Sequence, residues 1–202
     1  MAEGPVFRTM REQIADRIRT DVLSGRLEVG SSLREEFLAK QYGVSRAPVR
    51  DALLQLTQEG LLEAKPNCGV KVGEAPDEKL RPLIVQLRRK IESFALELAF
   101  DDFSEEDLKE LDATVTGLKK ACESQDMAEV VHYDMALHRC ILEVAGDAEL
   151  VAIWLPIVSR MMLHYSRHAD MMESYREHAE IVRAIRAKEK SAALETLLAN
   201  IQ

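Results

Sequence analysis

The sequence is poor in cysteine, with three in 202 residues. Because their number is odd, the cysteines do not fit a disulfide framework, and because they lack paired spacing, they do not fit a zinc site. We therefore expect Cys68, Cys122 and Cys140 to be reduced thiols and assign them no chemistry.

Long hydrophobic runs and common hydrolase motifs are also missing. No apolar stretch approaches the about 20 residues that a membrane-spanning helix needs, and the first residues lack the apolar core of a signal peptide. Neither a His-Glu-x-x-His motif nor a nucleophile motif occurs. The missing apolar segments predict a cytoplasmic protein that contacts no membrane. The missing motifs give little support to the interpretation that the protein is an enzyme.

Acidic residues outnumber basic ones, 35 to 27, but only in one part of the chain. Residues 1–75 contain 11 acidic and 11 basic residues. Of the totals of 35 acidic and 27 basic residues, 24 acidic and 16 basic residues therefore lie in the remainder of the chain. A charged partner responds to the local field rather than to the total charge. A neutral first part can therefore bind a polyanion through gathered arginines, and we expect the acidic part to face away from it.

The most informative stretch is residues 43–50, Gly-Val-Ser-Arg-Ala-Pro-Val-Arg. Ser45 is a suitable N-cap, and Pro48 is tolerated in a first helical turn because its missing N–H has no intrahelical partner there. A helix is therefore predicted to begin here. Arg46 and Arg50 lie four residues apart, on a different face from the apolar residues, so they point outward together.

A second short helix precedes this turn. Ser32 and Glu35 form a capping-box pattern at its start. The helix is predicted to bury Phe37 and Leu38 and to end at Gly43, where a left-handed cap suits glycine.

An earlier helix and a later hairpin complete the unit. Thr9-Met10-Arg11-Glu12 is another capping box, and it opens a helix that ends at Gly25. Residues 61–72 alternate apolar and polar side chains around Pro66-Asn67-Cys68-Gly69, which predicts a two-stranded wing with a turn at its tip.

Residues 43–53, Glu59-Gly60-Leu61 and Gly69 together resemble the winged helix-turn-helix of GntR-family bacterial transcription regulators. The resemblance covers residues 8–74 and implies a domain that binds double-stranded DNA. The alternative is an unrelated three-helix domain with a hairpin, in which the two arginines form only a solvated face.

The resemblance also implies which residues touch DNA. The two arginines would reach base edges or phosphates in the major groove, and the wing glycine would let the backbone approach the duplex. Many relatives have an arginine where this chain has Glu36, so either Arg34 substitutes for it or Glu36 faces away. The predicted DNA-binding residues are Arg34, Ser45, Arg46, Ala47, Arg50 and Gly69.

A short linker at residues 73–77 is followed by helical periodicity to the end of the sequence. We expect a second domain, residues 79–202, that is an all-α bundle of about six helices. The predicted helices span about 77–100, from 104 onward, 126–146, 148–167, 172–187 and 190–201. The predicted fold class is therefore mostly α.

Polar side chains occupy core positions of this bundle. Asp134 and His138 lie on one apolar helical stripe, and His178 lies on another. Burying such groups unpaired would cost several kcal/mol, and a bound cation explains them, since carboxylate and imidazole are common ligands of zinc and similar divalent metals. The alternative is an Asp–His hydrogen bond with His178 elsewhere.

Residues 79–202 resemble the FCD subfamily, named for the FadR C-terminal domain. The resemblance implies a divalent metal ion, zinc or similar, held by Asp134, His138 and His178. The fourth ligand position, a histidine in metal-binding members, falls at Asn200, whose carbonyl is a weaker ligand. Arg88 lies where members often place an arginine near the effector; the alternative is a solvated helix face.

His164 and His168 form another pair four residues apart. They flank the apolar stripe of their predicted helix, so we expect them near a pocket mouth or partly exposed rather than as metal ligands.

These features predict a homodimeric repressor of a near-palindromic operator. A small organic acid is the expected effector, bound through its carboxylate at an open coordination position of the metal. Two alternatives remain: a DNA-binding regulator with a purely structural metal or none, and a metal-dependent hydrolase.

Overall fold

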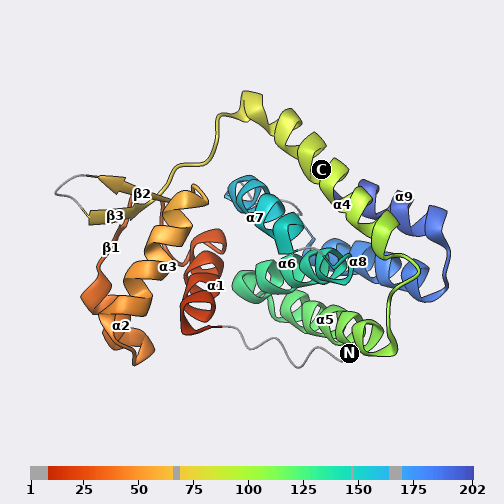
Figure 1. Cartoon of the computed structure of the whole chain (residues 1–202), viewed down its shortest axis with the longest axis horizontal. Coiled ribbons are helices and arrows are strands. Elements are labelled where there is room, and N and C mark those ends of the chain that lie inside the picture. The colour runs from red at the N-terminus through yellow and green to blue at the C-terminus, as the bar shows by residue number, and fades with distance from the viewer. Residues whose placement is uncertain (1–8, 66–68, 147, 164–169) are drawn as a thin grey trace.

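The computed structural model describes residues 9–65, 69–146, 148–163 and 170–202. Within these residues the chain forms nine α-helices, a short 3-10 helix and three short strands, in two bodies joined by an extended linker (Figure 1). The predicted fold class, mostly α with a winged helix-turn-helix before a helical bundle, is confirmed.

The N-terminal body, here called the reader domain, contains three helices and a small sheet. Its elements are α1 (Met10–Leu23), β1 (Ser32–Leu33), α2 (Glu35–Tyr42), α3 (Arg46–Gln58), β2 (Leu62–Lys65) and β3 (Gly69–Val72). α1 begins at the predicted capping box, where the Thr9 hydroxyl accepts from the Glu12 N–H and the Glu12 carboxylate accepts from the Thr9 N–H. Ile18, Leu56 and Leu61 are fully buried in the core of this domain.

α2 departs from the prediction at its start. Gly43 ends it with a φ of +66°, the expected left-handed cap. The capping box at Ser32 and Glu35 is wrong, because Ser32 belongs to β1 and the Glu35 carboxylate binds arginines of α3 instead. Phe37, predicted to be buried, is 66% exposed, since α2 turns Leu38 toward the core.

The wing forms as predicted, with an additional strand. β2 and β3 pair antiparallel, with Leu62 opposite Val72 and Lys65 opposite Gly69. β1 joins the free edge of β3, so the sheet has the order β1-β3-β2. Residues 66–68, and with them Cys68, lie outside the described residues.

The C-terminal bundle contains six α-helices among the described residues, as predicted. They are α4 (Arg81–Ala99), α5 (Glu105–Ser124), α6 (Met127–Val144), α7 (Ala148–Met162), α8 (Met171–Arg186) and α9 (Lys190–Asn200), and η1 (Glu78–Leu80) leads into α4. α6 packs against α4 and α5, and α8 packs against α5 and α9. His164 and His168 lie outside the described residues, so their predicted placement stays a prediction.

The two bodies touch through α1, which packs against α6 and α7 (Figure 1). An ion pair between Arg26 Nη2 and Asp126 Oδ1, 3.2 Å apart, also joins them. Over the described ranges, none of the helices combines the length and apolar character needed to cross a membrane.

Candidate metal centre and DNA-reading surface

The two predicted reading arginines stand on the outer face of α3. The side chains of Arg46 and Arg50 are 60% and 64% exposed. Both contact one carboxylate, that of Glu35 on α2: Arg46 Nη2 lies 3.2 Å and Arg50 Nε 3.1 Å from its oxygens. The hydrogen bond from Arg50 is the largest cause of a lowered Glu35 pKa. Glu35 therefore holds the two guanidinium groups together, which the sequence did not reveal.

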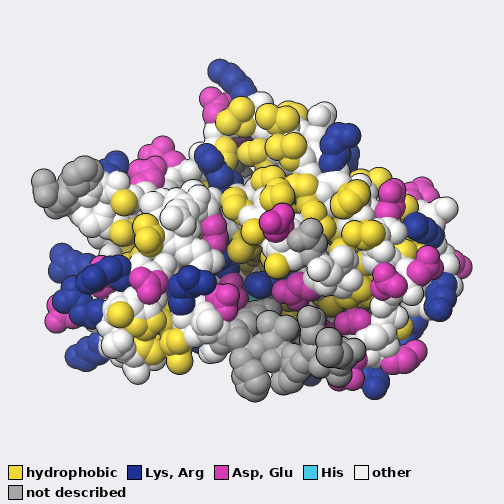
Figure 2. Space-filling model, in the orientation of Figure 1, with side chains coloured by type: hydrophobic (Ala, Val, Ile, Leu, Met, Phe, Trp, Pro, Cys, Tyr) yellow, Lys and Arg dark blue, Asp and Glu magenta, His cyan; other side chains and the backbone are white. Residues whose placement is uncertain are grey.

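The remaining predicted DNA-binding residues surround this pair. Ser45 and Ala47 are exposed at the start of α3, and Arg34 is exposed immediately before α2. Ser45 is the N-cap residue of α3 as expected, but its side chain makes no capping hydrogen bond among the residues described here. Gly69, at the start of β3, has a φ of +75°, where a side chain would be strained. Figure 2 shows lysine and arginine side chains gathered over the α2 end of the reader domain.

The structure brings three of the predicted metal ligands together. Asp134 and His138 lie one turn apart on α6, and His178 faces them from α8. Their ligand atoms all lie within 4.8 Å of one another, and all three side chains are fully buried. Atoms about 2.0–2.2 Å from one cation lie at most about 4.4 Å apart, so a small shift of the side chains is enough to bring the three onto a cation.

His178 is oriented by its own helix. Its Nδ1–H donates to the Ser174 carbonyl oxygen at 2.7 Å, so Nε2 is the ring nitrogen left to face Asp134. Nε2 lies 3.3 Å from Asp134 Oδ2. This contact is satisfied either by a proton on Nε2 or by a cation between the two atoms, and a nitrogen that faces a carboxylate in this way is placed as a metal ligand requires.

His138 is oriented by a residue that the sequence analysis missed. Its Nδ1 lies 2.6 Å from Glu92 Oε2 on α4, a close contact between possible ion-pair partners, and its Nε2 is buried without a hydrogen-bond partner in the described part of the chain. A carboxylate behind a histidine ligand fixes the ring and makes it more basic. Glu92 also accepts hydrogen bonds from Arg88 Nε and Trp154 Nε1, each at 2.6 Å.

Asn200, the predicted fourth ligand, is buried at the end of α9. Its Nδ2 donates to Glu177 Oε2 at 2.8 Å, so the amide oxygen is turned away from that carboxylate. This oxygen, Oδ1, is buried and has no hydrogen-bond partner among the described residues. This oxygen is therefore available as an uncharged ligand for a cation.

Arg88 is fully buried, so the alternative of a solvated helix face is wrong. It lies on α4 one turn before Glu92, and their contact is an ion pair. Its charge is among those that lower the pKa of Asp134, so the guanidinium lies within electrostatic reach of the three-residue cluster.

Charges inside the bundle set the protonation states of the cluster. Burial alone would raise the pKa of Asp134, but His178 and His138 outweigh it and hold this pKa below its usual range. Burial would also raise the pKa of Glu92, but Arg88 and His138 outweigh burial and bring this pKa to about 2. Burial lowers the pKa of His138, although the neighbouring Glu92 carboxylate acts in the opposite direction. Both carboxylates are therefore ionised near pH 7, and burial favours the neutral form of His138, which is the form that binds a metal. The residues present fit a divalent cation.

Two family models match the chain. The model described as "Bacterial regulatory proteins, gntR family" matches residues 10–72, and the FCD domain model matches residues 83–202.

Similar proteins cover almost the whole chain. A probable D-xylose utilization operon transcriptional repressor of Paenarthrobacter nicotinovorans is 27% identical over 94% of this chain and 84% of its own length. The gluconate operon transcriptional repressor of Bacillus subtilis is 25% identical over 93% and 80%. The solved structure of E. coli McbR/YncC has a TM-score of 0.80 at 25% identity, over 97% of this chain and 95% of that one. The metal-free FCD domain of TM0439 has a TM-score of 0.55 at 26% identity, over 63% and 89%.

Proposed function

This chain belongs to the gntR family of bacterial regulatory proteins and carries an FCD domain, and from this premise we propose how it works. It is a transcriptional regulator rather than an enzyme, as its curated relatives are. In our proposal it binds a near-palindromic operator as a homodimer and represses transcription. A small organic acid, bound at a divalent metal in the bundle, changes its affinity for the operator.

The reading surface supports the DNA-binding part of the proposal. Arg46 and Arg50 are exposed on one face of α3, and Glu35 fixes their spacing before DNA arrives. A guanidinium that binds guanine through two hydrogen bonds contributes about 1–3 kcal/mol of discrimination between bases. Because the groups are held in place, less side-chain entropy is lost on binding.

The observation that carries the regulatory part is the buried cluster of Asp134, His138 and His178. Each histidine has one nitrogen engaged by an oxygen of the protein and turns the other nitrogen inward. With Asn200 Oδ1 the chain offers up to four donors, so a cation that prefers five or six ligands keeps positions open. The carboxylate of an organic acid fits such a position, and Arg88 supplies a nearby positive charge.

An exposed apolar stripe on α4 supports the homodimer. Leu83, Leu87, Phe94 and Leu98 repeat on one helical face and are 39–57% exposed. Figure 2 shows hydrophobic side chains gathered over this helix. A patch of this kind on a helix is typical of an interface. Phe94→Asp is expected to convert the dimer to monomer in sedimentation analysis, whereas Phe37→Asp, at an exposed reader position, leaves it dimeric.

A purely structural metal is the second candidate, and the complete burial of all three ligands favours it. The two candidates differ in their response to small acids. We would measure the melting temperature of the zinc-loaded chain with a panel of small carboxylates, with and without chelator, beside His178→Ala. Stabilisation by a carboxylate that needs both zinc and His178 supports the effector site. Stabilisation by zinc but by none of the acids supports the structural metal instead.

A further inference from the structure

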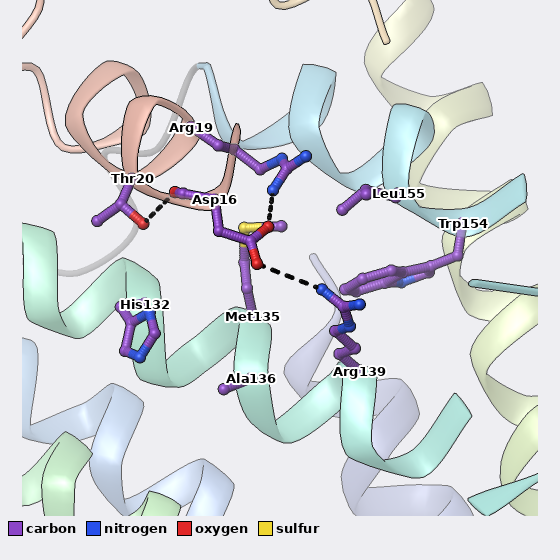
Figure 3. A pocket seen from close by; sticks show the side chains of 9 residues that line it. All are labelled: Asp16, Arg19, Thr20, His132, Met135, Ala136, Arg139, Trp154 and Leu155. Atoms are coloured by element: carbon purple, nitrogen blue, oxygen red, sulfur yellow. Dashed lines mark hydrogen bonds and ion pairs between the residues drawn. The ribbon is translucent and has the colours of Figure 1, made fainter. Parts of the chain in front are cut away.

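A small cavity of about 60 Å³ lies where the reader domain meets the bundle (Figure 3). Its wall combines residues of α1, α6 and α7, among them Asp16, Arg19, Arg139 and Trp154. Two of these residues connect it to the candidate metal centre. Arg139 follows His138 directly on α6, and Trp154 binds Glu92.

On the bundle side, one buried carboxylate joins the metal centre to this wall. Glu92 Oε2 lies 2.6 Å from Nδ1 of His138, and Glu92 Oε1 accepts from Nε1 of Trp154, also at 2.6 Å. Glu92 is 1% exposed and Trp154 is fully buried, so water cannot take over either contact. A displacement of the His138 ring therefore reaches the interface through two short contacts.

On the reader side, ion pairs continue from the same wall. Asp16 of α1 contacts Arg139 of α6 at 3.7 Å and also binds Arg19 within α1 (Figure 3). Arg19 in turn donates to both carboxylate oxygens of Glu59, at 2.8 and 3.0 Å. Glu59 is the C-cap residue of α3, the helix that carries the reading arginines.

The contact between α1 and α6 is bordered by a second, wider hollow that opens to solvent. This hollow has a volume of about 330 Å³, and polar side chains such as Asp16, Thr20, Glu129 and His132 line it. Close-packed interiors resist displacement, whereas a polar interface bordered by open hollows permits a second arrangement of the two bodies.

We propose that Glu92, Trp154 and the Asp16–Arg139 ion pair form a relay that transmits occupation of the metal centre to the reader domain. The inference rests on the proposed metal centre. His138 would hold the cation through its ring, which would fix the ring against Glu92 2.6 Å away, and Glu92 would follow that ring and carry Trp154 with it. Trp154, in the wall of the cavity, then shifts relative to Arg139 and Asp16, which sets the position of α1. The ion pair between Arg19 and Glu59 passes this change on to α3.

The first test uses the fact that Trp154 is the one tryptophan of the chain. Zinc is added to the metal-free full-length protein, and binding is followed both by tryptophan emission and by competition with a chromophoric chelator. The relay predicts that emission changes in step with zinc binding. Zinc binding without any change in emission would overturn it.

The second test measures coupling. The Kd of a duplex, selected by the wild-type chain from a random library, is measured with and without zinc at fixed salt. We expect the ratio of the two Kd values to differ from one by about 5- to 150-fold in the wild type. In Asp16→Asn and in Trp154→Phe it falls toward one, while zinc affinity stays within about twofold. The double variant adds nothing further, since both residues act in one series.

Arg26→Gln is the matched control, because it removes a different ion pair between the two bodies, to Asp126, without touching the relay. It is expected to keep the wild-type ratio. If Asp16→Asn and Trp154→Phe also keep that ratio, or if the wild type binds zinc and duplex with a ratio of one, the relay is refuted. Failure of the proposed function is distinct, since it is the absence of zinc binding or of duplex preference in the wild type itself.

Discussion

Replacing Glu92 by glutamine perturbs the centre of the bundle with almost no change in shape. The carboxylate is fully enclosed and meets Arg88, Trp154 and His138 at 2.6 Å each. Glutamine keeps an acceptor for one of these partners but removes the negative charge. The Arg88 guanidinium then stays buried opposite a neutral group, and His138 loses the carboxylate behind its ring.

The magnitude follows from the pKa of Glu92, which is about 2 against an ordinary 4.5. This difference corresponds to about 3 kcal/mol of stability at pH 7, in line with the about 3–5 kcal/mol lost when a buried ion pair is broken. The folded-state pKa is depressed, so the contribution is complete above pH 4.5 and is lost as the pH falls from there through 2. Roughly half remains near pH 3.

The assay is denaturant unfolding of the metal-free protein, followed by far-UV circular dichroism from pH 7 to pH 3. Glu92→Gln is expected to be about 3 kcal/mol less stable at pH 7 and to approach the wild type as the pH falls. Its zinc affinity should fall about 10- to 100-fold. Glu180→Gln, which removes an exposed partner of Arg183, is the control and should stay within about 0.5 kcal/mol. Equal stability and equal zinc affinity of Glu92→Gln and wild type would refute the reasoning.

Three further results are expected. Arg50→Ala should weaken binding to a selected duplex by about 1–3 kcal/mol in fluorescence anisotropy, because a groove contact is lost. His178→Ala should contain no stoichiometric zinc in elemental analysis, since one of three clustered ligands is gone. In a Cys68→Ser variant, Cys140 should not react with a thiol reagent at pH 8 until the protein is unfolded, because burial raises its pKa to about 12.

Each of these results has a control and a contradicting outcome. Arg183→Ala removes an exposed arginine of the bundle, and a loss of duplex affinity equal to that of Arg50→Ala would show a general charge effect. Zinc content in His178→Ala equal to that of the wild type would remove the proposed site. Rapid labelling of Cys140 in the folded variant, measured by mass spectrometry of its peptide, would show that the α6 interior is open to solvent.

Local patterns were enough to predict most of the fold. Capping boxes and helical periodicity located α1 and the helices of the bundle, because both signals depend on residues within one turn of each other. The four-residue spacing of Asp134 and His138 likewise placed both on one buried face. The two-residue strand β1 is too short to show an alternating pattern, so it was missed.

Contacts between distant segments were not predictable in this way. Glu92 and Trp154 are 62 positions apart, and nothing near either residue indicates that Trp154 donates a hydrogen bond to Glu92 beside the candidate metal centre. Glu35 fits a capping box equally well, but the arginines of α3 attract its carboxylate more strongly than a backbone N–H does. Phe37 follows helical spacing, but a helix of eight residues buries only a narrow face.

The most direct test of the central claim is the affinity of the purified chain for a selected duplex relative to a random duplex of equal length. Fluorescence anisotropy at one physiological salt concentration provides both Kd values. If the arginine pair on α3 reads base edges, the selected duplex binds at least about 1000-fold more tightly. Equal affinity for the two duplexes, with or without zinc, would contradict the account.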